Sequence, residues 1–313
     1  MAGAKARIVK VAQLQTQTVT CNLCGSAESR LIFPSTVQSS AEVADYVSTN
    51  TDYGRYHNIV QCTECGLLYM SPRDIGIPDF YGEVEDQAYL DTWEERAITF
   101  RGHLELLKKI KSAGKILDVG CYAGIFLHEA KKAGYEVAGI EPSRWASEYA
   151  RQKTGAQVWT GTCERITLPP AEFDVVTVWD VVEHFEDPSA CFRALHPTIK
   201  PGGLILVTTH DIDSRAARIF GKRYPWLMRF HLFHFSPKTL GKMLRRCGFE
   251  IISTEYYTKK FSVDYLMSRL GLRSWFPWFK KILVPVPTGD MFLIAARKPD
   301  AARGSGPGEE QAG

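Results

Sequence analysis

The sequence predicts an α/β protein in which a layered, largely parallel sheet follows a small cysteine-rich domain. From about residue 113 to residue 298, short apolar segments alternate with amphipathic ones, as strands alternate with helices in α/β folds. Runs such as VVTV and LILV are continuously apolar, which suits strands buried on both faces. Two C-x-x-C pairs precede this region and indicate a separate small unit.

The expected elements of the α/β region follow one another in chain order. Gly134 suits the end of the first helix, and Ser143 suits the N-cap of the second. The expected strands are residues 115–120, 135–141, 156–161, 173–180, 202–209, 250–257 and 290–298, and the expected helices are residues 124–134, 144–155 and 238–249.

Composition divides the chain into four regions. Residues 1–72 hold both cysteine pairs, and residues 73–112 indicate a helical connector because apolar residues recur there at roughly helical spacing. Residues 113–298 form the α/β domain. Residues 299–313 are rich in Gly, Pro and charge, so we expect a disordered tail.

The formal net charge of +3 argues against a protein built mainly to coat nucleic acid. The N-terminal residues lack the apolar stretch of a secretory signal, and no apolar run approaches the roughly 18–20 residues that span a bilayer. We therefore expect a cytoplasmic protein.

The two cysteine pairs, CNLCG and CTECG, repeat one pattern: C-x-x-C followed by glycine. Two such turns can direct four thiolates at one tetrahedral Zn²⁺ ion, which predicts a closed structural zinc site in a zinc-ribbon-like domain. The alternative, a redox C-x-x-C, usually occurs once and beside a βαβ unit. The predicted ligands are Cys21, Cys24, Cys62 and Cys65, whereas Cys121, Cys163, Cys191 and Cys247 are most simply small buried residues.

The stretch KILDVGCYAGIFL joins a strand to a helix through a glycine loop. Its glycines, Gly120 and Gly124, do not form G-x-G-x-x-G, and Asp118 would repel a pyrophosphate. An acid at this position suits a cationic nucleoside without phosphates, and S-adenosylmethionine fits that description. Glu141, at the end of the second strand, lies where an acid accepts hydrogen bonds from ribose hydroxyls.

These segments resemble the class I S-adenosylmethionine-dependent methyltransferases. The matching pieces are LDVGCYAG, VAGIEPS, FDVVTVWDVVEH and IKPGGLILVTT. The resemblance implies a Rossmann-like, seven-stranded sheet whose last strand, DMFLIAARK, is antiparallel, and a methyltransferase domain over residues 113–298. It implies cofactor contacts from Asp118, Gly120, Cys121, Tyr122, Gly124, Glu141, Pro142, Thr162, Cys163 and Asp180. With the cysteine pairs, the chain is similar to zinc-containing methyltransferases of sugar and natural-product pathways.

Candidate catalytic residues follow the fourth strand of the α/β region in WDVVEHFEDP. His184 is the predicted general base, since imidazole titrates near neutral pH and the family has a histidine here. A second interpretation is that Asp180, Glu183 and His184 resemble the E-x-x-E-H cluster of quinone-pathway O-methyltransferases and hold Mg²⁺. The third is structural: Glu183 caps a helix and His184 only hydrogen-bonds within a loop.

Two further segments indicate the acceptor side. Residues 210–240 interleave aromatic residues with cations, which predicts a lid over a phosphate- or carboxylate-bearing acceptor or, equally, a solvated helix. The cations of this prediction are, among those present, Arg215, Arg218, Lys222, Arg223 and Arg229. Residues 260–287 suit a membrane contact, a substrate wall or a dimer face.

The sequence therefore predicts methyl transfer to a small molecule, a saccharide or a lipid-linked intermediate, by an enzyme in the cytoplasm or peripheral to a membrane. RNA methylation is one alternative, because some rRNA methyltransferases carry an N-terminal zinc module, but DVVEH replaces the motif used for amino-group methylation. A partner-binding module that keeps the nucleoside site without turnover is the other.

Overall fold

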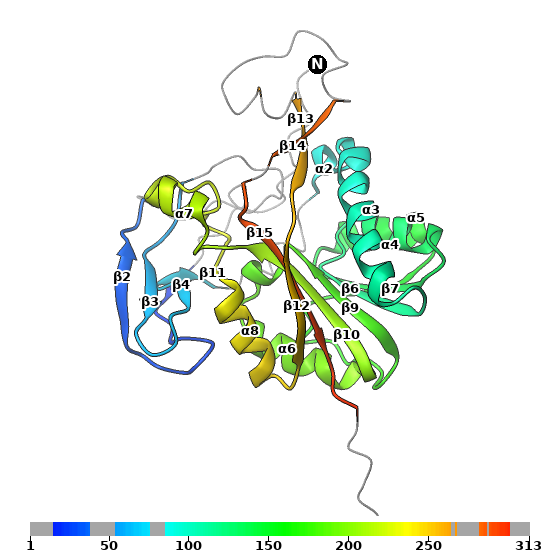
Figure 1. The fold of residues 1–313 in the computed structure, drawn as a ribbon, viewed down its shortest axis with the longest axis horizontal. Coiled ribbons are helices and arrows are strands. Elements are labelled where there is room, and N and C mark those ends of the chain that lie inside the picture. The colour runs from blue at the N-terminus through cyan, green and yellow to red at the C-terminus, as the bar shows by residue number, and fades with distance from the viewer. Residues whose placement is uncertain are drawn as a thin grey trace, which may run out of the picture.

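In the computed structural model, the described residues are 15–37, 54–75, 85–263, 267, 282–286 and 288–300. Their centre is a seven-stranded sheet with the strand order β12-β15-β10-β9-β6-β7-β8 (Figure 1). β15 runs antiparallel to both of its neighbours, whereas the remaining pairs are parallel, which confirms the predicted sheet. The strands are β6 (Lys115–Val119), β7 (Glu136–Glu141), β8 (Gln157–Thr160), β9 (Phe173–Trp179), β10 (Ile199–His210), β12 (Glu250–Tyr256) and β15 (Met291–Arg297).

Helices cover both faces of this sheet (Figure 1). Successive strand residues point to opposite faces, so Ile116 packs with the cluster under α3 and α4, whereas Leu117 packs with the cluster that includes residues of α6 and α8. Burial on both faces explains why these strands are continuously apolar. The main helices are α3 (Trp93–Ile110), α4 (Ile125–Lys132), α5 (Arg144–Thr154), α6 (Pro188–Leu195) and α8 (Pro237–Arg246).

The helix ends follow local chemistry. Ser143 caps α5 as predicted, because its side chain accepts a hydrogen bond from the Ala146 N–H at 3.2 Å. α4 ends at Lys132, and Gly134 follows with a left-handed φ of +93°. α6 is absent from the sequence prediction, although Asp187 and Pro188 are the N-cap and first-turn residues that favour a helix start.

The N-terminal residues form a second, four-stranded sheet with the order β11-β4-β3-β2. Its strands are β2 (Ser29–Phe33), β3 (Ile59–Cys62), β4 (Leu68–Met70) and β11 (Phe233–His234). β11 comes from the segment predicted to be a lid, so this part of the chain is joined to the N-terminal sheet by backbone hydrogen bonds.

Short elements complete the described part of the chain. The strands are β1 (Thr16–Gln17), β5 (Arg73–Asp74), β13 (Lys259–Ser262) and β14 (Leu283–Val286); the helices are α2 (Gln87–Asp91) and α7 (Arg215–Phe220); the 3-10 turns are η2 (Val182–His184), η3 (His196–Thr198) and η4 (Gly221–Arg223).

Within the described residues, no helix combines the length and the apolar character that a bilayer crossing requires. Most of the 260–287 segment and residues 301–313 of the expected tail lie outside the described residues, so their predicted roles stay predictions.

Candidate active site

A cavity of about 610 Å³ opens at the carboxyl ends of β6, β7, β8 and β9, the edge at which open α/β sheets bind ligands. Of the predicted site residues it gathers Asp118, Gly120, Cys121, Tyr122, Glu141, Pro142, Thr162, Cys163, Asp180, Glu183 and His184. Gly124 is not part of the lining. We call the part formed by residues 118–122, 140–142 and 161–165 the glycine-loop half, and the part formed by residues 183–187, Trp226, Met228, Phe230 and His231 the histidine half.

The two loop glycines have different tasks. Gly120 has a φ of +73°, and a Cβ there would lie 2.7 Å from Val181 Cγ1, so only glycine lets the loop pass that side chain. Gly124 has a φ of +78° and precedes α4, and a Cβ there would lie 2.9 Å from the Ala150 Cβ on α5. Gly124 therefore allows α4 to pack on α5 and does not line the cavity.

Asp118 is buried at the base of the glycine-loop half, with 3% of its surface exposed. The Thr177 hydroxyl donates to its Oδ1 at 2.7 Å. Burial raises the pKa of Asp118 to about 8, although this hydrogen bond opposes the shift. A buried carboxyl group with one neutral donor is ready to balance a cationic ligand.

Glu141 both lines the cavity and holds the glycine loop. Its Oε2 accepts from the Tyr122 N–H at 2.9 Å, and its Oε1 accepts from the Ser143 N–H at 2.8 Å. Burial raises its pKa to about 7, against the effect of these two donors. Tyr122 has a left-handed φ of +45°, an uncommon conformation for a non-glycine residue, and the bond from its N–H ties it to Glu141.

Sequence reasoning missed the cover that α2 and α3 provide. Tyr89, Arg96 and Phe100 line the cavity, although residues 73–112 were expected only to connect. The ring centres of Tyr122 and Tyr89 lie 4.2 Å apart, and the Arg96 guanidinium carbon lies 3.8 Å from the ring centre of Tyr89. No local motif marks these residues, because they meet the loop only through packing.

Asp180 and Glu183 are held by threonines of β10. Asp180 has a φ of +53°, and its Oδ1 accepts from Thr208 Oγ1 at 2.9 Å. Glu183 is 3% exposed, and its Oε2 accepts from Thr209 Oγ1 at 3.0 Å. Both carboxyl groups therefore have fixed positions at the border between the two halves.

His184 lies in the histidine half on the turn η2. Its Nδ1 lies 2.9 Å from the Phe230 carbonyl oxygen, so Nδ1 carries the proton and Nε2 is the acceptor. Burial lowers the pKa of His184 to about 4, which keeps the imidazole neutral near pH 7. The ring stacks on Phe230 with 5.1 Å between centres.

His231 is the neighbour of His184. The two ring centres are 4.8 Å apart, and His231 Nδ1 lies 2.9 Å from the Trp226 carbonyl oxygen. Glu183, His184 and His231 bring their ligand atoms within 4.8 Å of one another, whereas Asp180 is not in this group. Two imidazoles and one carboxylate are not the oxygen-rich set that Mg²⁺ prefers, so the predicted magnesium cluster gains no support.

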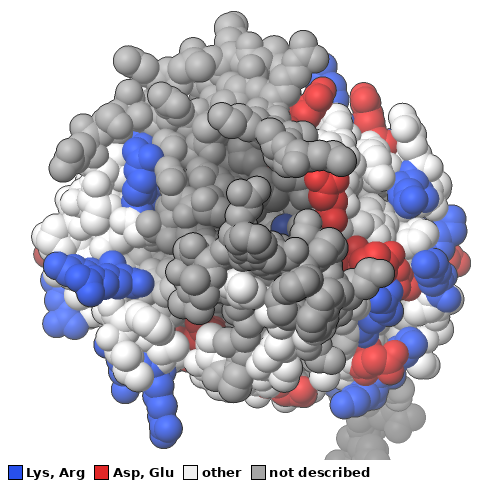
Figure 2. All heavy atoms as spheres, turned by 90° about the horizontal axis from the view of Figure 1, so that it is seen from above, with Lys and Arg blue, Asp and Glu red and all other residues white. Residues whose placement is uncertain are grey.

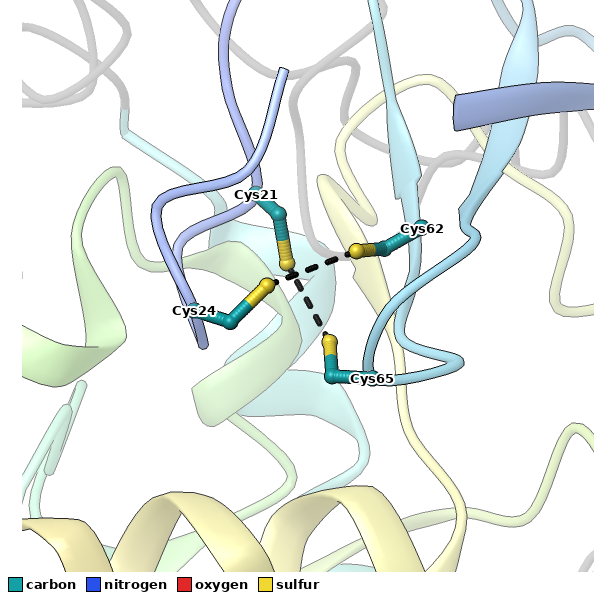
Figure 3. A group of neighbouring side chains, drawn as sticks. All are labelled: Cys21, Cys24, Cys62 and Cys65. Atoms are coloured by element: carbon teal, nitrogen blue, oxygen red, sulfur yellow. Dashed lines mark hydrogen bonds between the residues drawn. The ribbon is translucent and has the colours of Figure 1, made fainter. Parts of the chain in front are cut away.

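The four paired cysteines form a separate cluster outside the cavity. Figure 3 shows their sulfur atoms pointing toward a common centre, with 3.4 Å from Cys21 to Cys65 and from Cys24 to Cys62. Gly25 and Gly66 donate their N–H groups back to the carbonyl oxygens of Cys21 and Cys62, with φ of +81° and +83°. Two matching turns and four sulfurs within 4.8 Å fit a closed tetrahedral zinc site.

Two of the other cysteines correct the sequence interpretation. Cys163 and Cys191, expected to be separate buried residues, form a disulfide with 5.5 Å between their Cα atoms. The bond ties the cavity loop after β8 to α6, and the chain separation of 28 residues gave no sign of it. Cys121 and Cys247 are buried free thiols, as expected.

The cations of segment 210–240 that were expected to face a phosphate- or carboxylate-bearing acceptor do not line the cavity. Arg229 is buried, and its guanidinium Nε donates to Asp74 Oδ2 at 2.7 Å. Of the other cations named above, Arg215, Arg218, Lys222 and Arg223 are exposed and do not line the cavity. Figure 2 shows basic and acidic side chains interspersed at the right of the face seen from above, with basic ones at the left. Among the charged residues that line the cavity, seven are acidic and two are arginines, which suits a cation better than a phosphate.

Comparison with known proteins places this geometry in a family. The family described as "Methyltransferase domain" matches residues 91–254, just over half of the chain. The "Ubiquinone biosynthesis O-methyltransferase" of Azoarcus sp. is 30% identical over 165 residues, which cover 49% of this chain and 69% of that protein. Its namesake from Pseudomonas aeruginosa is 30% identical over 150 residues, 44% of this chain and 65% of that protein.

Among solved structures, a SAM-dependent methyltransferase from Archaeoglobus fulgidus is 18% identical, with a TM-score of 0.49 over 68% of this chain and all of that one. The strand order, the acid-lined cavity and the family match converge on one assignment: the chain belongs to the methyltransferase-domain family and is an S-adenosylmethionine-dependent methyltransferase.

Proposed function

We propose that this methyltransferase methylates a phenolic hydroxyl of a small ring compound, with the cofactor in the glycine-loop half and the acceptor in the histidine half. The observation that carries the proposal is the position of His184 in the same cavity as Asp118 and Glu141. A neutral imidazole with its Nε2 lone pair available can accept the proton that the hydroxyl loses.

The positions of the acidic residues support placing the cofactor in the glycine-loop half and the acceptor in the histidine half. S-adenosylmethionine supplies an electrophilic methyl group on a sulfonium and brings positive charge. Asp118 complements that charge, and Glu141 lies at the strand end that holds ribose hydroxyls in related sheets. The same acidic lining disfavours a polyanionic acceptor such as RNA and supports a neutral one.

The aromatic walls support a flat acceptor. Trp226, Phe230 and the His184 ring line the histidine half, and His210 stacks on Trp226 with 3.8 Å between ring centres. Such faces bury a ring, while hydrogen-bonding groups at the border orient its hydroxyl. The residues of this half would thereby align the oxygen with the methyl group, which is the main requirement of a displacement.

The basicity of His184 favours a phenol over a sugar alcohol. A phenolic O–H has a pKa of about 10, as in tyrosine, whereas aliphatic hydroxyls are much weaker acids. Burial lowers the pKa of His184 to about 4, so a more acidic hydroxyl is the better partner. The names of the two relatives, which specify oxygen methylation, point in the same direction.

The test is a methyl-transfer assay with isotopically labelled cofactor. The acceptors are 4-methylcatechol, a nucleotide-linked sugar, a lipid-linked sugar and a short RNA. Label in a methoxy group of the catechol, lost on His184→Ala, is the expected result. Label on either sugar would return the assignment to the saccharide or lipid-linked acceptors predicted from the sequence, and label on carbon or on RNA would likewise overturn the proposal.

A further inference from the structure

Asn22, between the two cysteines of the first pair, connects the cysteine cluster to the α/β domain. Its Nδ2 donates to Asp187 Oδ1 at 2.7 Å, and its Oδ1 accepts from the Ser189 N–H at 3.0 Å. Its backbone carbonyl accepts from Ser189 Oγ at 3.0 Å. One residue of the cysteine turn therefore makes three hydrogen bonds to a segment more than 160 positions away.

These contacts lie at the N-terminus of α6. Asp187 is the N-cap of this helix, and its Oδ1 also accepts from the Ala190 N–H at 2.7 Å. The first N–H groups of a helix have no partners within the helix, so Asn22 Oδ1 satisfies one of them and Asp187 another. The cysteine turn at Asn22 and the cap of α6 at Asp187 are therefore joined in one hydrogen-bonded unit.

The same helix cap ends a wall of the cavity. Residues 183–187 all line the histidine half, and Asp187 is the last of them. Arg73, from β5 of the N-terminal part, donates through Nη2 to the Glu186 carbonyl oxygen at 2.6 Å. At the other end of the wall, the Leu232 N–H donates to the Glu183 carbonyl at 2.8 Å, next to β11, which pairs with β4.

Packing supports the hydrogen bonds. Leu23, next to Asn22, belongs to the same buried cluster as Phe192 on α6 and Leu240 on α8. Arg246, from α8, also donates to the Leu23 carbonyl. The first cysteine turn therefore cannot shift without disturbing the helix that ends the wall.

We propose that the four-cysteine cluster holds residues 183–187, the wall of the histidine half, in position. Asn22 is the positioning residue that connects the two. The four cysteines fix the conformation of the turn that carries Asn22. The hydrogen bond from Asn22 fixes the position of Asp187. Residues 183–187 in turn determine where His184 lies. The inference rests on the proposed function for its assignment of the histidine half to the acceptor.

The first test needs no acceptor: hydrogen exchange of the backbone amides, read by mass spectrometry. Asn22→Ala removes the acceptor of the Ser189 N–H and a donor to Asp187, so amides of residues 183–190 should exchange at least about tenfold faster. The matched control is Asn58→Ala, because Asn58 accepts from the Ser35 N–H within the N-terminal part. It should accelerate exchange at Ser35 and leave residues 183–190 unchanged.

The second test replaces the amide of Asn22 with a carboxylate. Asn22→Asp places a carboxylate against Asp187 and should accelerate exchange further than Asn22→Ala.

The kinetic test separates positioning from simple loss of stability. With the acceptor that the unmodified protein methylates, Asn22→Ala should raise the acceptor KM or lower kcat, while S-adenosylmethionine affinity by calorimetry stays the same. Unchanged exchange at residues 183–190 in Asn22→Ala would overturn this proposal, and so would faster exchange with unchanged kinetics.

A failure of the proposed function would look different. Then the unmodified protein would not methylate the catechol, yet the exchange pattern of Asn22→Ala would remain. The two hypotheses are therefore judged on separate measurements.

Discussion

Asp118 and Glu141 are buried carboxyl groups at the base of one cavity, with pKa values that burial raises to about 8 and about 7. Neither has a cationic side chain among its hydrogen-bond partners given above, so a cationic ligand would supply the missing charge. This residue-scale arrangement predicts how cofactor affinity depends on charge and on pH.

We expect Asp118→Asn to raise the Kd for S-adenosylmethionine at least about tenfold at pH 8.5, equivalent to about 1.4 kcal/mol. The ratio of the two Kd values should shrink toward unity at pH 6. There Asp118, with a raised pKa of about 8, is protonated in the free protein and has lost the charge that the substitution removes. Calorimetry gives both Kd values at each pH. Because the two proteins bind the same ligand, the titration of the ligand itself cancels in their ratio. A ratio that stays constant would show that Asp118 does not act through its charge.

The second prediction at the residue scale concerns the role of His184 as a base. His184→Ala should lower kcat on the order of 100-fold, the usual contribution of a general base, and leave cofactor Kd unchanged. Since burial lowers the pKa of His184 to about 4, the unmodified enzyme should lose no activity through this group between pH 6 and 9. His128 on α4, outside the cavity lining, is the matched control. Normal turnover in His184→Ala would remove the base assignment.

At the scale of elements, the glycine loop shows how one residue type serves binding and packing. Gly124→Ala should destabilise the protein by more than Gly134→Ala, with a difference of about 1 kcal/mol or more. Both positions have positive φ, but only at Gly124 would the new methyl group meet α5, at 2.9 Å from Ala150. Urea unfolding of the two variants measures the difference. Equal losses would mean that α4 and α5 can separate without cost.

The elements also show where sequence patterns succeed. Strands β6 to β10 and helices α4, α5 and α8 were predicted because their periodicity and caps are local. α6 was missed, although its cap residues Asp187 and Pro188 are present in the sequence. β11 has two residues and exists only because β4 offers an edge.

For the whole molecule, the cysteine cluster and the main sheet share one core. Cys21 and Cys62 lie in the same buried cluster as residues of β6, β9 and α8. If zinc holds the four thiolates, one zinc per chain should be found by elemental analysis, and chelation should lower the Tm of a single cooperative transition. An early, separate transition after chelation would show that the two parts unfold independently.

The sequence by itself determined the sheet, the four-cysteine cluster and the glycine-loop half of the cavity. These depend on residues close in the chain: strand, loop and helix follow directly, and each C-x-x-C pair forms within one turn. The buried acids at the strand ends could also be predicted, because each one belongs to its own strand or follows it directly in the chain.

Only the tertiary structure decided the rest of the site. His231 reaches His184, Tyr89 reaches Tyr122, and Asn22 reaches Asp187 across 165 positions. The disulfide and the burial of Arg229 on Asp74 are likewise contacts between distant segments. No local pattern specifies such pairs, because the sheet and its covering segments bring them together only when the whole chain packs.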